Sequence, residues 1–413
     1  MTLKDDVIWA DGVPITAADI CFTVDAILEP QNPVTWLWMA REELSGCQVV
    51  SEKVALVKFV ERPAHHKDTL NFAILPAHRF ESTVIPADHP IKREVWGSTG
   101  IHARITDRRA IFKVAREVPQ TRYRIGEWEV RDGYGVDDLL AGRVDGLVSV
   151  EIDDYPRVQV EDDFALKSFD LRTFWYVAIR EEGALADVDT RRKLDAAIDR
   201  LALRETTQWI DPDDANPPVE FISGPFVQSS PHYNRAVKVR EHEPVDLSGL
   251  TLRLGIPSRQ NDDDPLLLEA LANQWRSLGA DVQSTVLEGV DPMAWAPTKG
   301  SGGVVDLLII SAEEPMRGFE RRRDHLFGTD GKNNPLGLSI PAADELIEEG
   351  RTARTDTEQH DAMHALHQLL HEDAHALFLW KRDAKSAWSN AVRNNTIAPG
   401  MYYTDAAGWR SDR

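Results

Sequence analysis

The middle of the chain alternates between short apolar runs and amphipathic segments. Phe174 to Ile179 is an aromatic and β-branched run with the length of a buried strand. After a polar loop, apolar residues recur with the spacing of one helical face, at Leu194, Ala197, Ile198 and Leu201. We therefore expect a strand, a loop and a helix in this order.

Similar patterns occur nearer the N-terminus. Residues 44–60 form two β-like runs around a polar centre, which predicts a hairpin. Thr16 stands as an N-cap before an apolar helical face that runs to Leu28. Leu147 to Val150 predicts a short strand.

Towards the C-terminus, Leu250 to Pro257 and Val304 to Ile310 have the patterns of strands, and the residues between 266 and 275 have the pattern of a helix. Strand, helix and strand at this spacing favour a mostly parallel α/β sheet.

Composition narrows the classes of protein. A chain of 413 residues suits two or three domains. Its net charge of −21 disfavours nucleic acid and anionic membrane surfaces as partners. It is compatible with solubility, with adaptation to salt, or with cationic ligands. No run approaches the ~20 apolar residues of a membrane span.

Two cysteines occur, Cys21 and Cys47. Cys21 lies within the apolar pattern of a predicted helix, so we expect a buried thiol in preference to a disulfide or a metal ligand.

The segment from Thr173 to Arg200 carries motifs of a known family. It resembles the strand, D-V loop and V-R-x-A-L-x-x-A-I-D-R helix of the peptide/nickel-type (family 5) extracellular solute-binding proteins of ABC importers. The matching residues are Tyr176, Asp187, Val188, Arg191, Ala197, Ile198, Asp199 and Arg200. Arg180 and Ala184 depart from the family's Asn and Pro.

The segment from Lys4 to Leu28 resembles a second motif of this family. The matching residues are Asp6, Val7, Trp9, Asp11, Gly12, Pro14, Thr16, Ala17, Asp19, Phe22 and Thr23. In relatives this motif lies well inside the mature protein, so the resemblance implies a chain that lacks an N-terminal segment and a signal peptide. Met1 is followed by polar residues and not by the apolar stretch of a signal peptide.

The resemblance implies an α/β fold of the two-lobed periplasmic-binding-protein type (type II, large cluster), with a hinge and an interlobe cleft. We expect lobe one at residues 1–172, lobe two at 173–376 and a return to lobe one at 377–413. The return follows Glu372-Asp373-Ala374, which resembles the family's E-D-A-P.

The resemblance also implies a function. The chain would be the substrate-binding component of an ABC importer, a monomer that captures a small peptide or similar solute by hinge closure and delivers it to a permease. It would need no cofactor, catalyse no reaction and work in the periplasm or outside the cell. No G-x-S-x-G or Cys/His nucleophile motif favours an enzyme. Two alternatives stay open: a cytosolic ligand-sensing module, if Met1 is the true start, and a metal (nickel) carrier.

The expected ligand-binding residues follow the apolar run that ends at Ile310. Ligands of open α/β sheets bind beyond the carboxyl ends of the strands. Glu314-Pro315 matches an acidic-Pro pair of the family's peptide binders, and Glu313 is the candidate for the ligand's amino group. Arg317 could bind a carboxylate, and Phe319 closes the same loop. Solvated carboxylates are the alternative.

The last predicted helix carries a stripe of histidines, at His360, His364, His367 and His371. Their spacing puts them on one face, and pairs at i, i+4 can chelate a transition metal. No acidic residue stands at the spacing of a third metal ligand. We therefore expect these histidines to lie on a solvent-facing flank of the helix and to bind no metal.

Overall fold

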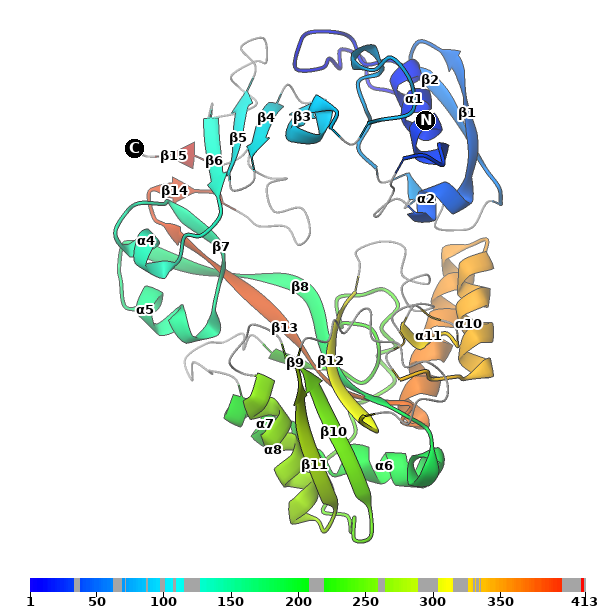
Figure 1. The fold of residues 1–413 in the computed structure, drawn as a ribbon, viewed down its shortest axis with the longest axis vertical. Helices are drawn as coiled ribbons and strands as arrows, with labels where there is room; N and C mark the ends of the chain where they lie inside the picture. The colour runs from blue at the N-terminus through cyan, green and yellow to red at the C-terminus, as the bar shows by residue number, and fades with distance from the viewer. Residues whose placement is uncertain are drawn as a thin grey trace. The chain divides into compact units, whose positions relative to one another are not determined.

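A computed structural model describes the protein within residues 1–32, 38–61, 69–70, 72–86, 88–96, 101–106, 109–114, 127–207, 219–258, 264–288, 304–314, 326–329, 331, 334, 336–395 and 410–411. The chain divides into two compact units (Figure 1): Met1–Lys167 with Lys385–Arg413, and Ser168–Ala384. It passes between them within β8 (Phe164–Ile179) and within β13 (Ala376–Ser389). The boundaries expected from the sequence, after residues 172 and 376, lie inside the same two strands.

The N-terminal part of the first unit is a helix packed on a hairpin. Strands β1 (Leu44–Ser51) and β2 (Val54–Phe59) pair in antiparallel register, which confirms the predicted hairpin. Helix α1 (Ala17–Leu28) begins after Thr16, whose backbone N–H donates to the Asp19 carboxylate at 2.8 Å. The apolar face of α1 packs in two small clusters, one around Ala55 and the other around Leu44.

Cys21 and Cys47 form a disulfide that joins α1 to β1, with their Cα atoms 5.0 Å apart. The expected buried free thiol is therefore wrong. Periodicity showed that Cys21 faces the core, but the hairpin alone decides that Cys47 lies opposite it.

The remaining elements of the first unit are short. Strands β3 (Glu94–Trp96), β4 (Ile101–Thr106), β5 (Arg109–Val114) and β6 (Glu127–Arg131) form an antiparallel sheet. Strand β7 (Gly146–Val150) confirms the short strand predicted from Leu147 and pairs with β13. The others are α2 (Trp38–Glu43), η1 (Ala77–Arg79), η2 (Pro90–Arg93), α4 (Val136–Leu140), η3 (Ile152–Asp154), α5 (Tyr155–Gln159) and the paired β14 (Val392–Arg393) and β15 (Arg410–Ser411).

The second unit is built on a mixed sheet. Its strand order is β11 (Asp281–Leu287), β10 (Thr251–Pro257), β12 (Leu307–Glu313), β8 and β13, with β9 (Val219–Phe221) on β13. Strands β10, β11 and β12 are parallel, with α8 (Asp264–Ser277) between β10 and β11. The sheet is not mostly parallel as expected, because β8 is antiparallel to β12 and β9 is antiparallel to β13.

The last part of strand β8, from Phe174 to Ile179, is buried on both faces. Tyr176 and Ala178 belong to a core cluster with α10 (Pro341–Thr352) and α11 (Asp356–Glu372). Val177 and Ile179 belong to a second cluster with α8 and the helix that follows β8. Since neighbouring strand residues point to opposite faces, a continuous apolar run fits this position.

The predicted helix after β8 is divided in two. η4 (Gly183–Ala186) precedes α6 (Val188–Ala196), and α7 (Arg200–Thr207) begins after a break. Leu201 was assigned to the apolar face of a single helix, but it is 49% exposed. The residues between Ala196 and Arg200 are not helical, so the helical spacing does not continue from α6 to α7.

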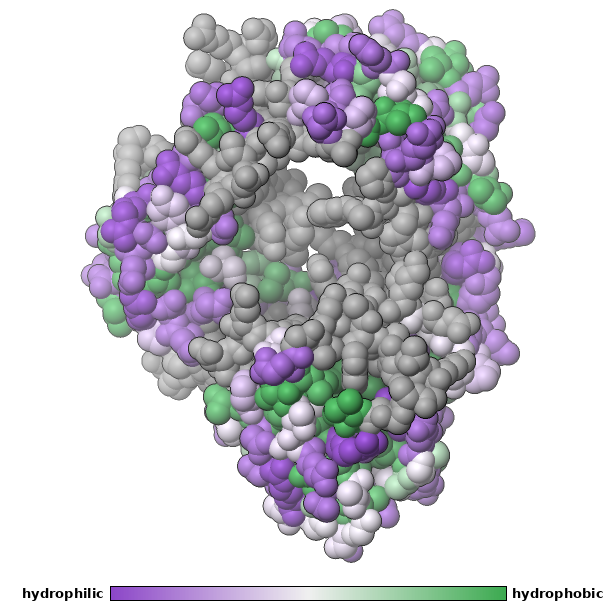
Figure 2. Space-filling view, viewed as in Figure 1, coloured by the Kyte–Doolittle hydropathy of each residue, from purple (hydrophilic) through white to green (hydrophobic). Residues whose placement is uncertain are grey.

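Within the described segments, no helix has both the length and the apolarity that crossing a bilayer would require. On the face drawn in Figure 2, the described residues are mostly hydrophilic, and the apolar residues lie in separate patches. Apolar exposure of this kind is ordinary for a protein surface.

Candidate functional site

The loop expected to contact ligand begins at the end of β12. Glu313 is paired with Thr173 of β8, while its side chain, together with all of Arg317 and Phe319, lies outside the described residues. Glu314 is only 1% exposed, and its Oε2 accepts a hydrogen bond from the backbone N–H of Val227 at 2.5 Å. The backbone N–H of Glu314 donates to the carbonyl oxygen of Arg172 at 2.8 Å. Glu314 therefore joins the end of β12 to the segment that follows β9.

One histidine of the stripe is a core residue. His367 is 0% exposed, and its Nδ1 accepts from the backbone N–H of Asn234 at 3.1 Å. In the neutral ring the proton is then on Nε2, which lies 3.0 Å from the Oγ of Ser223. A Cβ at Gly224 would lie 2.1 Å from this ring, so glycine is required there. The expected solvent-facing flank is wrong for His367, because the segment from Gly224 to Asn234 covers it.

His360 and His364 contact the same segment. The Nε2 of His364 lies 3.3 Å from the carbonyl oxygen of Pro231, and the ring of His360 lies 5.0 Å from the ring of His232. Across the described segments, no three His, Cys, Asp or Glu side chains are grouped closely enough to hold a metal ion.

Arg191 of helix α6, which carries part of the family motif, binds the C-terminal end of α11. This side chain is 3% exposed and donates to the carbonyl oxygens of Leu185 and Ala186, both at 3.0 Å. Its Nε donates to the carbonyl oxygen of Asp373 at 3.1 Å. A guanidinium group at these carbonyls suits both the unpaired acceptors and the dipole of a helix C-terminus.

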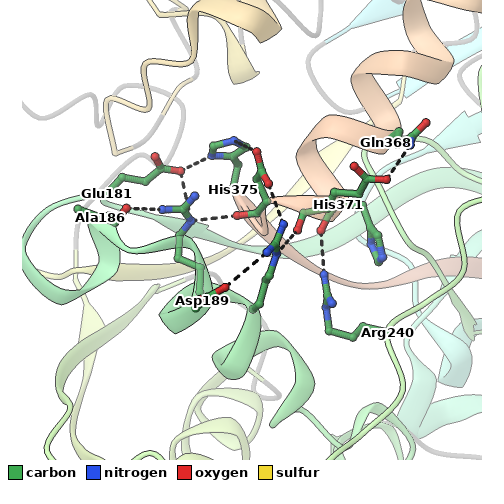
Figure 3. Close-up of polar contacts among 11 residues, drawn as sticks. Glu181, Ala186, Asp189, Arg240, Gln368, His371 and His375 are labelled. Atoms are coloured by element: carbon green, nitrogen blue, oxygen red, sulfur yellow. Dashed lines mark hydrogen bonds and ion pairs between the residues drawn. The ribbon is translucent and has the colours of Figure 1, made fainter.

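Arg192 and His375 complete this attachment, and Figure 3 shows His375 directed to Glu181. Arg192 donates to the carbonyl oxygen of Glu372 at 2.7 Å and to Oδ1 of Asp373 at 3.1 Å. The Nδ1 of His375 contacts the carboxylate of Glu181. His375 occupies the position where the resembling family has proline, and here it binds the loop that follows β8.

Asp195 is the centre of a second attachment. It is 3% exposed, contacts the guanidinium of Arg200 and accepts from Nε of Arg240 at 2.8 Å. Arg200 in turn donates to the carbonyl oxygen of Phe378 in β13 at 2.9 Å. Much of the motif thus holds α6 and α7 to β13 and α11. The sequence offered one sign of this role, because the acidic Asp195 directly follows Leu194, which lies on the predicted apolar face of the helix.

A charged cluster surrounds Lys381, near the point where β13 passes to the first unit. Its Nζ lies 2.6 Å from Oδ1 of Asp383 and 3.3 Å from Oδ1 of Asp170. These carboxylates and the nearby Glu220 raise the pKa of Lys381, although burial opposes them. The sequence analysis did not identify this cluster, because its members come from three separate strands.

The three carboxyl groups differ in pKa. Burial raises the pKa of Glu220 and of Asp383 above their ordinary values, and one lysine does not compensate for it. Burial also acts on Asp170, but the hydrogen bond from Ser229, the charge of Lys381 and the N–H of Arg172 together lower its pKa. The cluster therefore raises the pKa of two of its carboxyl groups and lowers that of the third.

Comparison with known proteins gives the fold. No protein-family model and no curated protein matches the chain. The ABC transporter substrate-binding protein CtaP from Listeria monocytogenes has a TM-score of 0.86 at 15% identity, over 100% of this chain and 87% of that chain. The oligopeptide-binding protein AppA from Bacillus subtilis, in complex with a nonapeptide, has a TM-score of 0.70 at 15% identity, over 100% and 86%. NikZ from Campylobacter jejuni, in complex with Ni(L-His), has a TM-score of 0.75 at 14% identity, over 99% and 87%.

At these identities the likeness is one of fold. The expected fold class is confirmed: the chain has the α/β fold of the two-lobed type II periplasmic binding proteins.

Proposed function

From this shared fold we propose that the protein is the substrate-binding component of an ABC importer, which captures a small peptide or a similar solute. The observation that carries the proposal is the TM-score of 0.86 to an ABC transporter substrate-binding protein over the whole chain. The B. subtilis relative, solved with a nonapeptide, supports a peptide as the ligand class. The protein would act as a monomer and deliver its ligand to a permease.

The two passages of the chain support capture by hinge closure. Each unit has apolar clusters of its own, and the chain passes between them only within β8 and β13 along its described course. Hinge motions need backbone changes at only a few positions.

The described ligand-loop contacts favour Glu313 over Glu314 for the ligand's amino group. Glu314 is buried and accepts from Val227, whereas Glu313 is the last residue of β12. We place Arg317 and Phe319 in the same loop as further contacts. No cofactor or resident metal is part of this proposal.

The disulfide between Cys21 and Cys47 supports a periplasmic or extracellular location, because structural disulfides persist mainly outside the cytoplasm. A cytosolic ligand-sensing module would bind similar solutes but would not be expected to hold a structural disulfide. Fractionation of the source cells, with antibody to the protein, distinguishes the two locations.

Calorimetry with a peptide mixture and its N-acetylated counterpart tests the ligand assignment. We expect free peptides to bind and acetylation, or Glu313→Gln, to weaken binding about 30-fold or more, since an ion pair of this kind contributes about 2–5 kcal/mol.

Small-angle scattering should show a more compact protein when ligand is bound. Equal binding of both mixtures would remove the amine contact, and absence of binding together with an unchanged radius of gyration would contradict the function. Nickel with free histidine is the comparison ligand.

A further inference from the structure

A groove lies within the second unit, between the last turn of α11 and the segment from Asn234 to Arg240. Its volume is about 430 Å³. Its lining residues are Asn234, Ala236, Val237, Lys238, Arg240, Gln368, His371 and Glu372. Pockets of about 300–1,000 Å³ are typical for small molecules. At about 30 Å³ for each water molecule, the groove has room for an organic molecule and not only for a single inorganic ion.

Two cationic side chains line this groove. The exposed Lys238 donates to the carbonyl oxygen of Arg235 at 2.8 Å. An ammonium group has three N–H donors, so Lys238 can also donate to a ligand. Arg240 is held by Asp195 at 2.8 Å and by the carbonyl oxygen of His371 at 3.1 Å. Figure 3 shows the guanidinium of Arg240 directed to this carbonyl. Its position is therefore set before a ligand binds, which reduces the entropic cost of binding.

His371 adds a group that can take up a proton. Burial is the main cause that lowers its pKa below the ordinary value of 6.5, and the charges of Arg240 and Arg200 act in the same direction. The charge of Asp195 and the backbone of Ser223 oppose this shift. The ring is thus neutral at pH 7, and a negative charge beside it would favour the protonated form.

The one carboxylate among the lining residues is Glu372, and its Oε1 accepts from Nε2 of Gln368 at 2.6 Å. Against a protein charge of −21, an anion would bind only where cationic groups converge. The negative charge of Glu372 therefore lowers the affinity of the groove for an anion, and the attraction comes from the cationic groups.

We propose that this groove is a second ligand site, which binds a small organic anion carrying carboxylate or phosphate groups through Lys238, Arg240 and His371. The site is made by the second unit alone and does not depend on the proposed transport function. Binding is coupled to protonation of His371, so affinity rises as the pH falls.

The direction of this coupling follows from linkage. In the free protein His371 is deprotonated above its lowered pKa, and the bound anion raises that pKa. Between the two values the complex holds a proton that the free protein lacks. Affinity therefore increases by up to about tenfold for each pH unit of decrease in this window.

The test is calorimetry of citrate, glycerol 3-phosphate and inorganic phosphate at constant ionic strength, with imidazole signals followed by NMR. We expect citrate or glycerol 3-phosphate to bind more tightly than inorganic phosphate and to shift the signals of His371, assigned from their loss in His371→Gln. Preference between the first two separates the carboxylate and phosphate sources. The full-length protein is used throughout.

Matched charge changes separate the groove from general counterion binding. Lys238→Gln should weaken binding about threefold to fivefold, and Glu372→Gln should tighten it about twofold to threefold, as expected for exposed charges. Lys58 and Glu52, exposed residues of the first unit that do not line the groove, provide the controls, and Lys58→Gln and Glu52→Gln should leave affinity unchanged.

Two results would overturn the proposal. One is absence of any shift of the His371 signals with millimolar anions in a protein that remains folded by circular dichroism. The other is an equal effect of the groove variants and the control variants of the first unit. Because Lys238→Gln leaves the ligand loop intact, peptide binding in that variant should be retained, so failure here is distinct from failure of the proposed function.

Discussion

The two units are stabilised in different ways. The N-terminal part of the first unit has two small apolar clusters and a disulfide between α1 and β1. The second unit has large apolar clusters on both faces of its sheet and buried charged attachments at Asp195 and Arg191. A small core gains most from a covalent link, because the link reduces the entropy of the unfolded chain. The first unit should therefore respond to reduction, and the second to loss of a buried charge.

The largest effect should come from Asp195→Ala in the second unit. The change leaves the buried Arg200 and the half-buried Arg240 without their carboxylate, which costs about 3–5 kcal/mol for a buried pair. Differential scanning calorimetry should show a lower unfolding temperature for the transition of the second unit. Asp189→Ala is the control, since its side chain is 75% exposed and its contact with Arg192 is 3.5 Å long. If both variants lowered the unfolding temperature equally, the ion pairs of the buried Asp195 would not stabilise the second unit more than an exposed contact does.

Removal of the disulfide should have the next largest effect, in the first unit. Cys21 and Cys47 are separated by 26 residues, and closing a loop of this length stabilises a protein by about 3 kcal/mol. Cys21→Ala with Cys47→Ala should lower the unfolding temperature of the first unit and leave that of the second unchanged. Dithiothreitol should have the same effect on the native protein and none on the double variant. A shift of both transitions would contradict this difference between the units.

The smallest effect should be a pH dependence in the second unit. Burial raises the pKa of Glu220 above its ordinary value of 4.5, so the folded protein holds a proton that the unfolded chain releases. Stability from this group is complete below pH 4.5 and is lost as the pH rises through the raised pKa. Glu220→Gln should therefore be more stable than the native protein at neutral pH, by less than about 1 kcal/mol because the group is only half-buried.

Asp170 provides the opposite case in the same cluster. Its pKa is lowered, so its contribution is present above its ordinary value of 3.8 and is lost as the pH falls through the lowered pKa. Urea unfolding from pH 3 to 8 should show Asp170→Asn losing stability at neutral pH, where Glu220→Gln gains it. Parallel curves for both variants would show that the cluster does not divide in this way.

The sequence by itself determined the local elements and the class of fold. The hairpin at residues 44–60, the Thr16 cap and the strand from Phe174 follow from turn residues, capping and periodicity, which act over a few positions. The order of the family motifs indicated the two-lobed fold before any contact was known.

Only the tertiary structure decided which polar groups are buried and what they bind. Glu314, expected among the ligand-binding residues, is buried and accepts from Val227, and His367, expected on a solvent-facing flank, lies under the segment from Gly224 to Asn234. The Cys21–Cys47 disulfide and the Lys381 cluster likewise join distant segments. Burial and pairing of this kind depend on which elements pack together, and periodicity within one segment does not contain that information.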